Sequence, residues 1–463
     1  RAEPRAAPIV QHRGTPRRER GLFIPHLVHS KMCKAPSIQS EKLLQYLNLI
    51  IFIDALGVAL VIPNVTFLFT EFGGTAKSFG MLSATYSAAQ LMGGLALGYL
   101  ADRSLGHDRA LLISFAGASV SYILVGVADA LPLLVASRII VGLTKQTVTC
   151  CTALTSSLTA SADRTKALAR LTSSMTLASL IGSSVGGLLS QHFGRRMPCF
   201  VASAFYVANI ALVQFVLPHA YLRALQRVGI QVTGDGPSAG SKSASGKTAS
   251  DSHHLSEFSS FGRLLASLRG PGGGILALRL MYGLLLRAVY SLHALYEAQE
   301  WALTPLVAGY LASYSQLLGL VVEWGVIGRL VDVVPERTLL LASLCVAALN
   351  SALEWNHRLL SLYILVHLPL GAVAKSITRS CLTSLFTKSV PVADVGLALS
   401  MLNICQSAVS VVAPLYGGFM LGKLGLAAQP AAAALNYVLL FLLSAWLVRS
   451  RTPARSDSHA KKA

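Results

Sequence analysis

Residues Phe52 to Asn64 have the sequence FIDALGVALVIPN, and they lie inside an apolar run that extends from Leu43 to Phe69. Asp54 is the only formally charged residue of that run. A run of about 20 apolar residues is long enough to cross a bilayer as a helix. A carboxylate inside such a helix is costly unless it faces a partner or water, so Asp54 is a candidate functional residue.

Similar apolar runs fill most of the 463 residues, of which 53% are hydrophobic and 13% charged. Soluble proteins average roughly a quarter charged residues, so lipid is the expected solvent. The runs lack strand-period alternation and are too long for barrel strands, which favours helices. The sequence therefore predicts an all-α membrane protein with twelve transmembrane helices: Leu43–Phe69, Phe79–Leu100, Leu111–Ala128, Leu131–Leu158, Leu171–His192, Pro198–Leu217, Ile275–Leu295, Leu306–Arg329, Leu339–Leu353, Leu359–Phe386, Val395–Leu421 and Ala431–Val448.

The formal net charge of +19 is distributed unevenly between the two sides of the predicted membrane. With the amino terminus inside, 28 of the 39 Lys and Arg residues lie in inner segments, five in outer loops and six in the apolar runs. This bias predicts that both termini are cytosolic. Basic tails next to a membrane favour anionic lipids, and the scattered charges do not indicate nucleic-acid binding. The host membrane is the plasma membrane or that of an intracellular vesicle.

The chain repeats itself on either side of a segment rich in Ser and Gly, residues 231–260. A shift of 230 residues places Gly98 on Gly328 and Lys145 on Lys375. We therefore predict two homologous six-helix halves in the same orientation. The predicted organisation is a basic cytosolic tail at 1–42, an N-terminal half at 43–217, a flexible cytosolic linker at 218–271, a C-terminal half at 272–449 and a second basic cytosolic tail at 450–463.

The stretch GYLADRSLGHDR, residues 98–109, follows the second predicted helix, and GRLVD, residues 328–332, occupies the matching place in the second half. The first stretch resembles the loop signature of the major facilitator superfamily, although its later glycine, Gly106, stands one residue late. The resemblance implies the major facilitator fold of two parallel six-helix repeats. In that family an acid at this place meets a helix amino terminus, where the dipole favours it, and latches the inner gate. The implied gating residues are Gly98, Asp102, Arg103, Gly328 and Asp332.

A glycine-rich stretch on the fifth predicted helix, ASLIGSSVGG at 178–187, resembles the antiporter motif of the same family, with Ser183 where proline is usual. Arg138 and Gly142 match the family's Arg-x-x-x-Gly pattern on the fourth helix. A shift of 231 places the final glycine pair on a second pair in the other half. The implied glycine hinge residues are Gly182, Gly186, Gly187, Pro414, Gly417 and Gly418.

The stretch that carries Asp54 is similar to the first helix of tetracycline-efflux proteins, with Gly57 and Pro63 in the same relative places. The segment VAGYLASYSQLLG, residues 307–319, resembles eukaryotic organic-cation-transporter-like carriers of this branch. Tetracycline carriers have further acids in helices 3 and 9. Here neither predicted helix has one, and Glu354 is expected to lie beyond the end of helix 9. Tetracycline specificity is therefore not implied.

Charges inside the apolar runs identify the candidate site. Six are cations, on the fourth, seventh and tenth predicted helices, and two are acids, Asp54 and Glu323. In the family, helices 1, 4, 7 and 10 line a central cavity. The candidate substrate and proton-coupling residues are Asp54, Arg138, Lys145, Arg287 and Lys375. For each of them a structural ion pair or contact with the headgroups is the alternative role. His293 and His367 are either packing residues or members of a proton relay.

These observations predict a secondary transporter of a small organic solute that works by alternating access, with protonation of Asp54 as a candidate coupling step. Six cations against two acids favour an anionic or zwitterionic solute. The alternatives are a drug or cation:proton antiporter, an uncoupled uniporter, and a receptor or scaffold that has the transporter fold without flux. We expect a monomer without cofactor or metal, and no motif indicates an enzyme.

Overall fold

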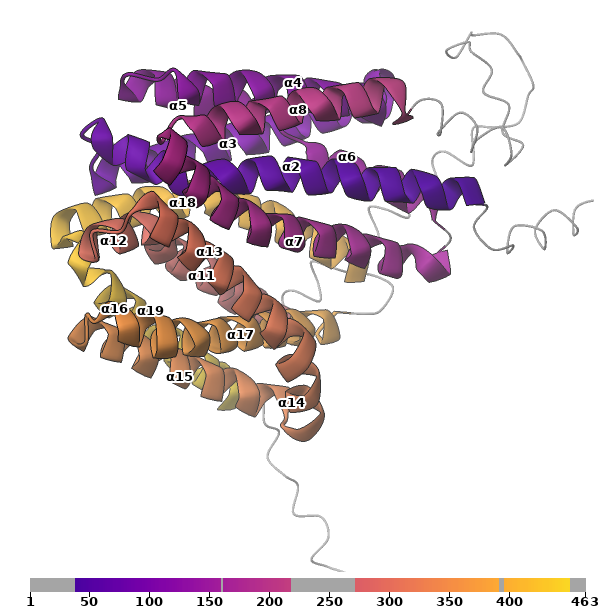
Figure 1. Cartoon of the computed structure of the whole chain (residues 1–463). Coiled ribbons are helices and arrows are strands. Elements are labelled where there is room, and N and C mark those ends of the chain that lie inside the picture. Colours follow the sequence, from indigo (N-terminus) through magenta and orange to yellow (C-terminus); the bar gives the residue numbers. More distant parts are fainter. Residues whose placement is uncertain (1–37, 160, 218–270, 391–394, 450–463) are drawn as a thin grey trace, which may run out of the picture.

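The computed structural model describes residues 38–159, 161–217, 271–390 and 395–449, which form a bundle of helices without strands (Figure 1). This confirms the predicted all-α membrane fold class. The elements of the N-terminal half are α2 (Ile38–Glu71), α3 (Ala76–Leu100), η1 (Ala101–Leu105), α4 (His107–Gly126), α5 (Leu131–Thr144), α6 (Thr147–Leu158), α7 (Ser161–Phe193) and α8 (Met197–Phe215). Those of the C-terminal half are α11 (Pro271–Tyr290), α12 (His293–Glu300), α13 (Pro305–Val321), η2 (Val322–Val326), α14 (Ile327–Val333), α15 (Glu336–Asn356), α16 (Leu360–Leu362), η3 (Tyr363–His367), α17 (Leu368–Lys388), α18 (Val395–Leu424), η5 (Leu426–Ala428) and α19 (Gln429–Arg449).

Ten helical segments within the described ranges are long and apolar enough to cross a membrane. The predicted spans at α3 and α7 are helices of 25 and 33 residues, but they fall outside this set. Both are rich in Gly, Ala, Ser and Thr, which lower hydropathy without ending a helix. The chain is thus a multi-pass membrane protein, whereas the count of twelve spans stays a prediction. The predicted central linker and the two tails lie outside the described residues, except for residues 38–42 and 271.

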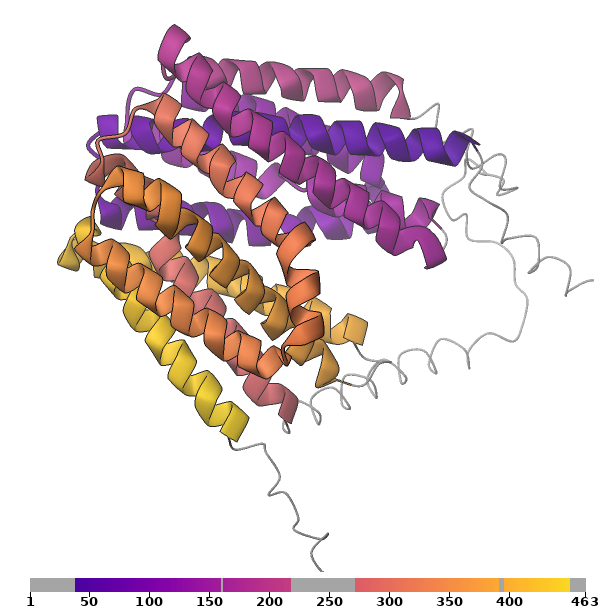
Figure 2. The same cartoon turned by 60° about the horizontal axis from the view of Figure 1, so that its bottom comes forward.

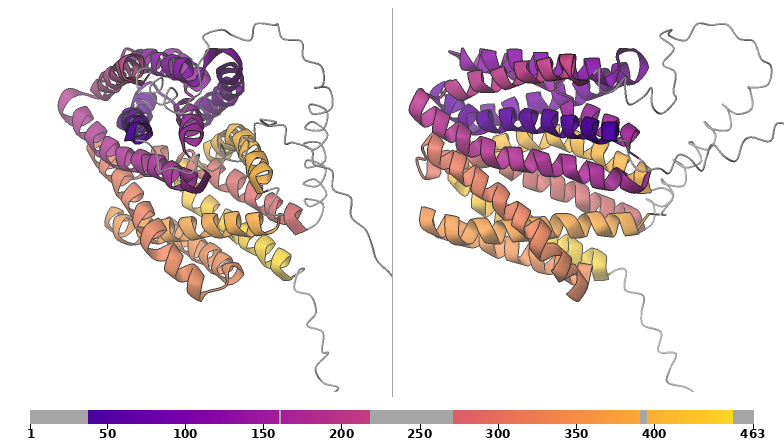
Figure 3. Two further views of the ribbon diagram at one scale, coloured as in Figure 1. Left: turned by 90° about the vertical axis from the view of Figure 1, so that its right-hand side faces the viewer. Right: turned by 45° about the vertical axis from the view of Figure 1, so that its right-hand side comes forward.

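The two halves lie side by side, with the indigo-to-magenta half next to the salmon-to-yellow half (Figure 3). Their glycine pairs have matching places in the packing. Within the halves, Gly186 lets α7 approach α2, and Gly417 lets α18 approach α11. Between the halves, a Cβ on Gly187 would lie 2.8 Å from the Pro305 carbonyl oxygen of α13. A Cβ on Gly418 would lie 2.9 Å from the Cα of Gly80 on α3. The repeat in the sequence is therefore a repeat in the contacts.

These contacts between halves lie at one end of the bundle, which we call the closed end and which holds the connections at 72–75, 194–196 and 301–304. There the hydroxyl of Ser184 donates to Ser313 Oγ at 2.6 Å, and that of Ser313 donates to the Leu180 carbonyl at 2.6 Å. At the opposite end, a Cβ built on Gly98 or Gly328 would meet nothing within 4 Å. Figure 2 shows α7 and α14 apart at that end. The described conformation is closed at one end.

Two predicted spans are interrupted, which the sequence analysis did not anticipate. The run Leu131–Leu158 is divided into α5 and α6 at Lys145 and Gln146. The run Ile275–Leu295 is divided into α11 and α12 at residues 291–292, and α12 continues to Glu300. Apolar composition marks membrane depth and not backbone continuity, because side chains can replace the lost backbone hydrogen bonds.

The expectation for Glu354 was wrong. Helix α15 continues through this residue to Asn356, and the amide of His357 closes the last turn by donating to the Leu353 carbonyl. Glu354 is only 8% exposed, so its carboxyl group belongs to the interior of the C-terminal half. The apolar run ends before the helix does because a buried polar residue can extend a helix without extending its hydrophobicity.

Candidate functional site

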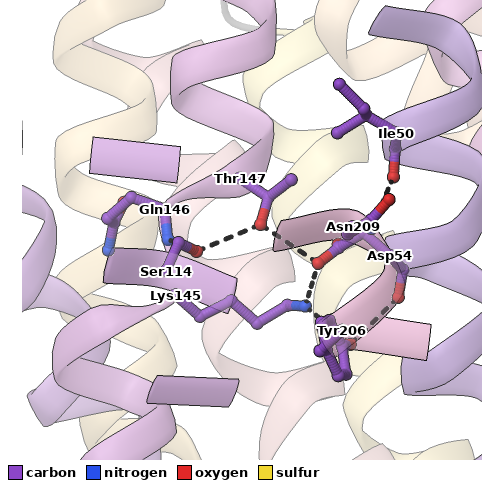
Figure 4. A network of polar contacts seen from close by, with 8 residues as sticks. All are labelled: Ile50, Asp54, Ser114, Lys145, Gln146, Thr147, Tyr206 and Asn209. Carbon is purple, nitrogen blue, oxygen red and sulfur yellow. Dashed lines mark hydrogen bonds and ion pairs between the residues drawn. The ribbon is translucent and has the colours of Figure 1, made fainter. Parts of the chain in front are cut away.

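The centre of the candidate site is Asp54, which lies on α2 and is 2% exposed. Lys145 Nζ lies 2.6 Å from Asp54 Oδ1, and the hydroxyl of Thr147 donates to the same oxygen at 3.0 Å (Figure 4). The Lys145 side chain is 12% exposed, so both charges of the pair are largely removed from solvent. Of the predicted site residues, the structure brings these two together.

Tyr206 of α8 completes the site from a third side. Its hydroxyl donates to the Asp54 backbone carbonyl at 3.0 Å and accepts from Lys145 Nζ at 3.1 Å. The ammonium also lies 4.9 Å from the centre of the tyrosine ring, which stacks on Tyr122 at 5.4 Å. A Cβ on Gly57 would lie 3.1 Å from this ring, so the glycine of the opening stretch leaves room for the tyrosine.

The break between α5 and α6 positions Lys145. Its backbone is extended, with ψ at 95°, so the helix stops and the side chain leaves toward α2. The freed amide of Gln146 donates to Ser114 Oγ on α4 at 3.0 Å, and the Ser114 hydroxyl also contacts Thr147 Oγ1 at 3.1 Å. A side chain of a neighbouring helix thereby satisfies a backbone donor that the break exposes in the membrane.

A buried ion pair of this kind is not simply a stabilising contact. Removing two charges from water costs several kcal/mol per ion, and mutual attraction with added hydrogen bonds offsets that cost. If Asp54 takes up a proton, the attraction disappears and Lys145 is left as a cation in a low-dielectric setting. The arrangement can therefore bind a proton and change the availability of the lysine at the same time.

Lys375, the repeat counterpart of Lys145, has a different environment. It lies on the uninterrupted helix α17, and its ammonium lies 3.7 Å from the centre of the Tyr290 ring on α11. No carboxylate of the described residues lies within ion-pair distance of it. By the 230-residue shift, the counterpart of Asp54 is Leu284. The C-terminal half thus has the lysine without the acid.

Among the described residues, none of the other predicted cations forms an ion pair with Asp54. Arg138 on α5 has its Nε and Nη2 buried, without a hydrogen-bond partner in the described part of the chain. Arg287 donates to the Ser410 hydroxyl on α18. Arg279 lies with its guanidinium 5.7 Å from the Tyr282 ring, and Arg379 pairs with Glu323. Within the described residues, four of the six cations therefore lack a carboxylate partner: Arg138, Arg279, Arg287 and Lys375.

The predicted gating residues lie at the end opposite to the closed end. Arg103 is exposed on η1, and its guanidinium lies 5.2 Å from the centre of the Tyr99 ring. Asp332 is exposed on α14. The side chain of Asp102 lies outside the described ones. A latch made by these residues stays a prediction.

Sequence reasoning missed three groups that shape the site. Tyr206 and Thr147 contact Asp54 directly, and Ser114 holds the helix break. One signal for Tyr206 was available, because the 231-residue shift places it on Tyr437. Nothing comparable marks Ser114, whose role depends on a break that composition does not reveal.

The amino-acid sequence of this chain is similar to those of several known proteins. The family model described as Major Facilitator Superfamily matches residues 47–322. Solute carrier family 22 member 18 of Rattus norvegicus is 29% identical over 373 residues, which cover 78% of this chain and 83% of that protein. Solute carrier family 67 member A1 of Homo sapiens is 28% identical, over 85% and 88%. The class B tetracycline resistance protein of Escherichia coli is 30% identical over 169 residues, 36% of this chain and 42% of that protein.

Solved structures share the fold. A bacterial homologue of the human lysosomal transporter Spinster, in an inward-facing and unoccupied conformation, superposes with a TM-score of 0.65 at 14% identity. The superposition covers 91% of this chain and all of that one. The human organic anion transporter MFSD10 (TETRAN) gives a TM-score of 0.57 at 18% identity, covering 90% of this chain and all of that one.

Proposed function

The chain belongs to the Major Facilitator Superfamily, and from this premise we propose that it is a secondary transporter that moves a small organic solute by alternating access. The single observation that supports this proposal best is the set of four bundle cations that have no carboxylate partner among the described residues, in a bundle that also holds one buried aspartate–lysine pair. Such charges are costly inside a membrane protein unless they face water, a partner or a ligand.

Alternating access requires two ends that open in turn. The described conformation has the halves in close contact at the closed end, where glycines allow backbone contact. We propose that this end faces outward, that both termini are cytosolic, and that α3 and α7 complete twelve spans. In the opposite state the glycine contacts separate, and the gating residues at Asp102 and Asp332 meet helix amino termini.

The substrate's charge follows from the unpartnered cations. A cation in a low-dielectric environment attracts anions and repels other cations, and the effect is strongest where no fixed acid neutralises it. Arg138 has buried donors without partners, and Lys375 has only an aromatic ring beside its ammonium. We therefore assign the substrate to small organic anions or zwitterions, whose acidic group would lie between the two halves.

Protonation of Asp54 is the proposed coupling step. The proton removes the charge that holds Lys145, so the lysine becomes free to attract the substrate's acidic group. Proton and anion then bind to the same state of the carrier, and a proton gradient drives the anion in the proton's direction. The sign of this coupling is a consequence of the Asp54–Lys145 pair at 2.6 Å.

A second candidate, cation:proton antiport, is favoured by the class B tetracycline resistance protein and by the acid on α2. In that mode a cationic substrate and a proton compete for Asp54. The close contact with Lys145 opposes this mode, because the incoming cation has to displace the ammonium from Oδ1.

A charge screen distinguishes the modes. The purified full chain is reconstituted in liposomes, and counterflow of radiolabelled benzoate, glutarate, glycine betaine and tetraethylammonium is measured without a proton gradient, with an inward one and with an outward one. We expect counterflow of an anion or of the zwitterion, raised by the gradient. Flux of tetraethylammonium alone, driven by an outward gradient, would establish the second candidate. Absence of flux across a panel extended within each charge class would support a receptor or scaffold.

A further inference from the structure

A second group of titratable side chains lies in the C-terminal half, outside the candidate site. His293, the first residue of α12, has its Nε2 3.0 Å from the hydroxyl of Tyr363 on η3 and 3.5 Å from Glu297 Oε1. The tyrosine hydroxyl donates to the same carboxylate oxygen at 2.6 Å. On the other side of the ring, Nδ1 lies 3.1 Å from Gln429 Nε2. The four side chains form one hydrogen-bonded chain.

The hydrogen bonds of this chain are complete when His293 is neutral. The Nε2 proton goes to Tyr363, and the tyrosine proton goes to Glu297. The unprotonated Nδ1 accepts one amide hydrogen of Gln429, whose other hydrogen goes to the Val289 carbonyl at 3.1 Å. A second proton on the ring turns Nδ1 from a hydrogen-bond acceptor into a donor. Nδ1 then has to donate to the side-chain carbonyl oxygen of Gln429, which lies 3.4 Å away. The amide cannot turn its oxygen fully to Nδ1 and also keep its bond to Val289.

The Val289 carbonyl belongs to the break between α11 and α12. The amide of Leu292 reaches it at only 3.4 Å, so the Gln429 amide is its better donor and links α19 to the break. Helix α12 also packs against α2 of the other half at the closed end. A change at Gln429 is therefore passed to a hinge that supports the contact between the halves.

We propose that His293 is a proton-binding site, distinct from Asp54, whose occupation turns the Gln429 amide, releases the Val289 carbonyl and loosens the closed end. The ligand is the proton itself. Histidine changes its charge between about pH 5 and 8, which suits a switch at an extracellular or vesicular face. The site does not depend on the identity of the transported solute.

Several groups face this site and set its titration. Glu297 and Tyr363 lie on the Nε2 side, and the rings of Tyr290 and Tyr296 lie 5.2 and 6.0 Å from the histidine ring. Two charged groups act through space, Lys375 of α17 on His293 and Glu354 of α15 on Tyr363. The site therefore has charged neighbours of both signs, the two carboxylates and the lysine.

Trp301 gives a built-in reporter, because its ring lies 4.3 Å from that of Tyr363 and 5.5 Å from that of Tyr296. The full chain is prepared with its other three tryptophans replaced by Phe, and Trp301 fluorescence is followed from pH 5 to 8. Opening is followed in a separate preparation by the labelling rate of the thiol introduced by Leu306→Cys at the closed end. In that preparation the seven native cysteines are replaced by Ala.

The expected result is one fluorescence midpoint in this range and a severalfold faster labelling below it. His293→Gln removes both responses, whereas His367→Gln, the same change at a buried histidine elsewhere in the C-terminal half, keeps them. Gln429→Glu places a carboxylate at Nδ1 and raises the midpoint by about one pH unit or more. Fluorescence or labelling that does not change with pH, or a pH response that persists in His293→Gln, would overturn the proposal. Neither readout requires transport, so this result is independent of the substrate screen.

Discussion

Lys145 and Lys375 stand 230 residues apart at matching places of the two halves, yet they have opposite surroundings. Lys145 lies at a helix break, and its Nζ is neutralised by Asp54 Oδ1 at 2.6 Å. Lys375 projects from a continuous helix onto the Tyr290 ring, and the position that corresponds to Asp54 is Leu284. One half therefore pairs its lysine with an acid, whereas the lysine of the other half has no acid within ion-pair distance among the described residues.

This difference suggests a division of labour between two copies of one fold. The repeat supplies the frame, including matched glycine pairs at 186–187 and 417–418 that bring helices together within and between the halves. The charges then differ between the copies. We interpret the N-terminal half as the proton-sensitive part and the C-terminal half as the permanent anion-attracting part.

The largest expected effect comes from Asp54→Asn, which makes Lys145 resemble Lys375 by removing its acid. Uptake driven by a proton gradient should fall at least about tenfold, because the carboxylate that is proposed to take up the coupled proton is gone. Exchange of bound solute should remain in part. If the variant accumulates solute as well as the wild type does, the carboxylate is structural and the contrast between the halves fails.

The stability of the two lysine sites should also differ. Lys145→Met leaves the Asp54 carboxylate buried without its partner, and such a loss costs about 3–5 kcal/mol. Lys375→Met removes a cation–π contact, worth about 0.5–2 kcal/mol. Unfolding of both variants in the same mixed micelles measures the difference. The double variant Asp54→Leu with Lys145→Met should lose less unfolding free energy than the sum of the losses of its two single variants. Equal losses of unfolding free energy in Lys145→Met and Lys375→Met would contradict a difference between the two lysine sites.

Substitutions of glycines test whether closure at the closed end depends on close backbone contact between the halves. Gly187→Ala adds a Cβ 2.8 Å from the Pro305 carbonyl, and overpacking of this kind costs about 1–3 kcal/mol in the closed state. Labelling of a thiol at the closed end should become faster. Gly319→Ala on α13 is the matched control, since its Cβ would meet nothing within 4 Å in this conformation. Equal labelling rates in both variants would contradict the role of the glycines.

A smaller effect is expected at the gating motif, where the two halves should behave alike. Asp102→Asn and Asp332→Asn each weaken attraction to a helix amino terminus by about 0.3–2 kcal/mol, which disfavours the outward-open state. A shift of that size changes the populations of the two states severalfold. Unchanged accessibility of engineered thiols at the closed end in both variants would contradict a latch.

The fold class could be predicted, and Asp54 and Lys145 could both be named as candidates, because these predictions depend on composition and position. Long apolar runs, a constant repeat shift and an isolated acid in a membrane helix are all visible in the sequence. Which of the candidate cations pairs with Asp54 is decided by a helix break at Lys145. The Ser114 hydroxyl of another helix stabilises this break. Glu297 and Glu354 were missed for a related reason, since helices α12 and α15 extend past the apolar runs that marked them. Hydropathy predicts where a chain crosses lipid, whereas tertiary hydrogen bonds decide where its helices bend and end.

The central claim is that an unneutralised cation in the C-terminal half attracts the substrate's acidic group. The charge screen first identifies a transported anion. The most direct test then compares the proton-driven uptake of that labelled anion in two variants, Lys375→Gln and Lys423→Gln. Lys423 also lies over an aromatic ring, at 4.5 Å from the centre of Phe419, but it is exposed at the closed end. We predict that Lys375→Gln reduces uptake at least about tenfold, while Lys423→Gln leaves it near the wild-type rate. Equal anion uptake by both variants, or wild-type transport of tetraethylammonium with no transport of any anion or zwitterion, would contradict the account.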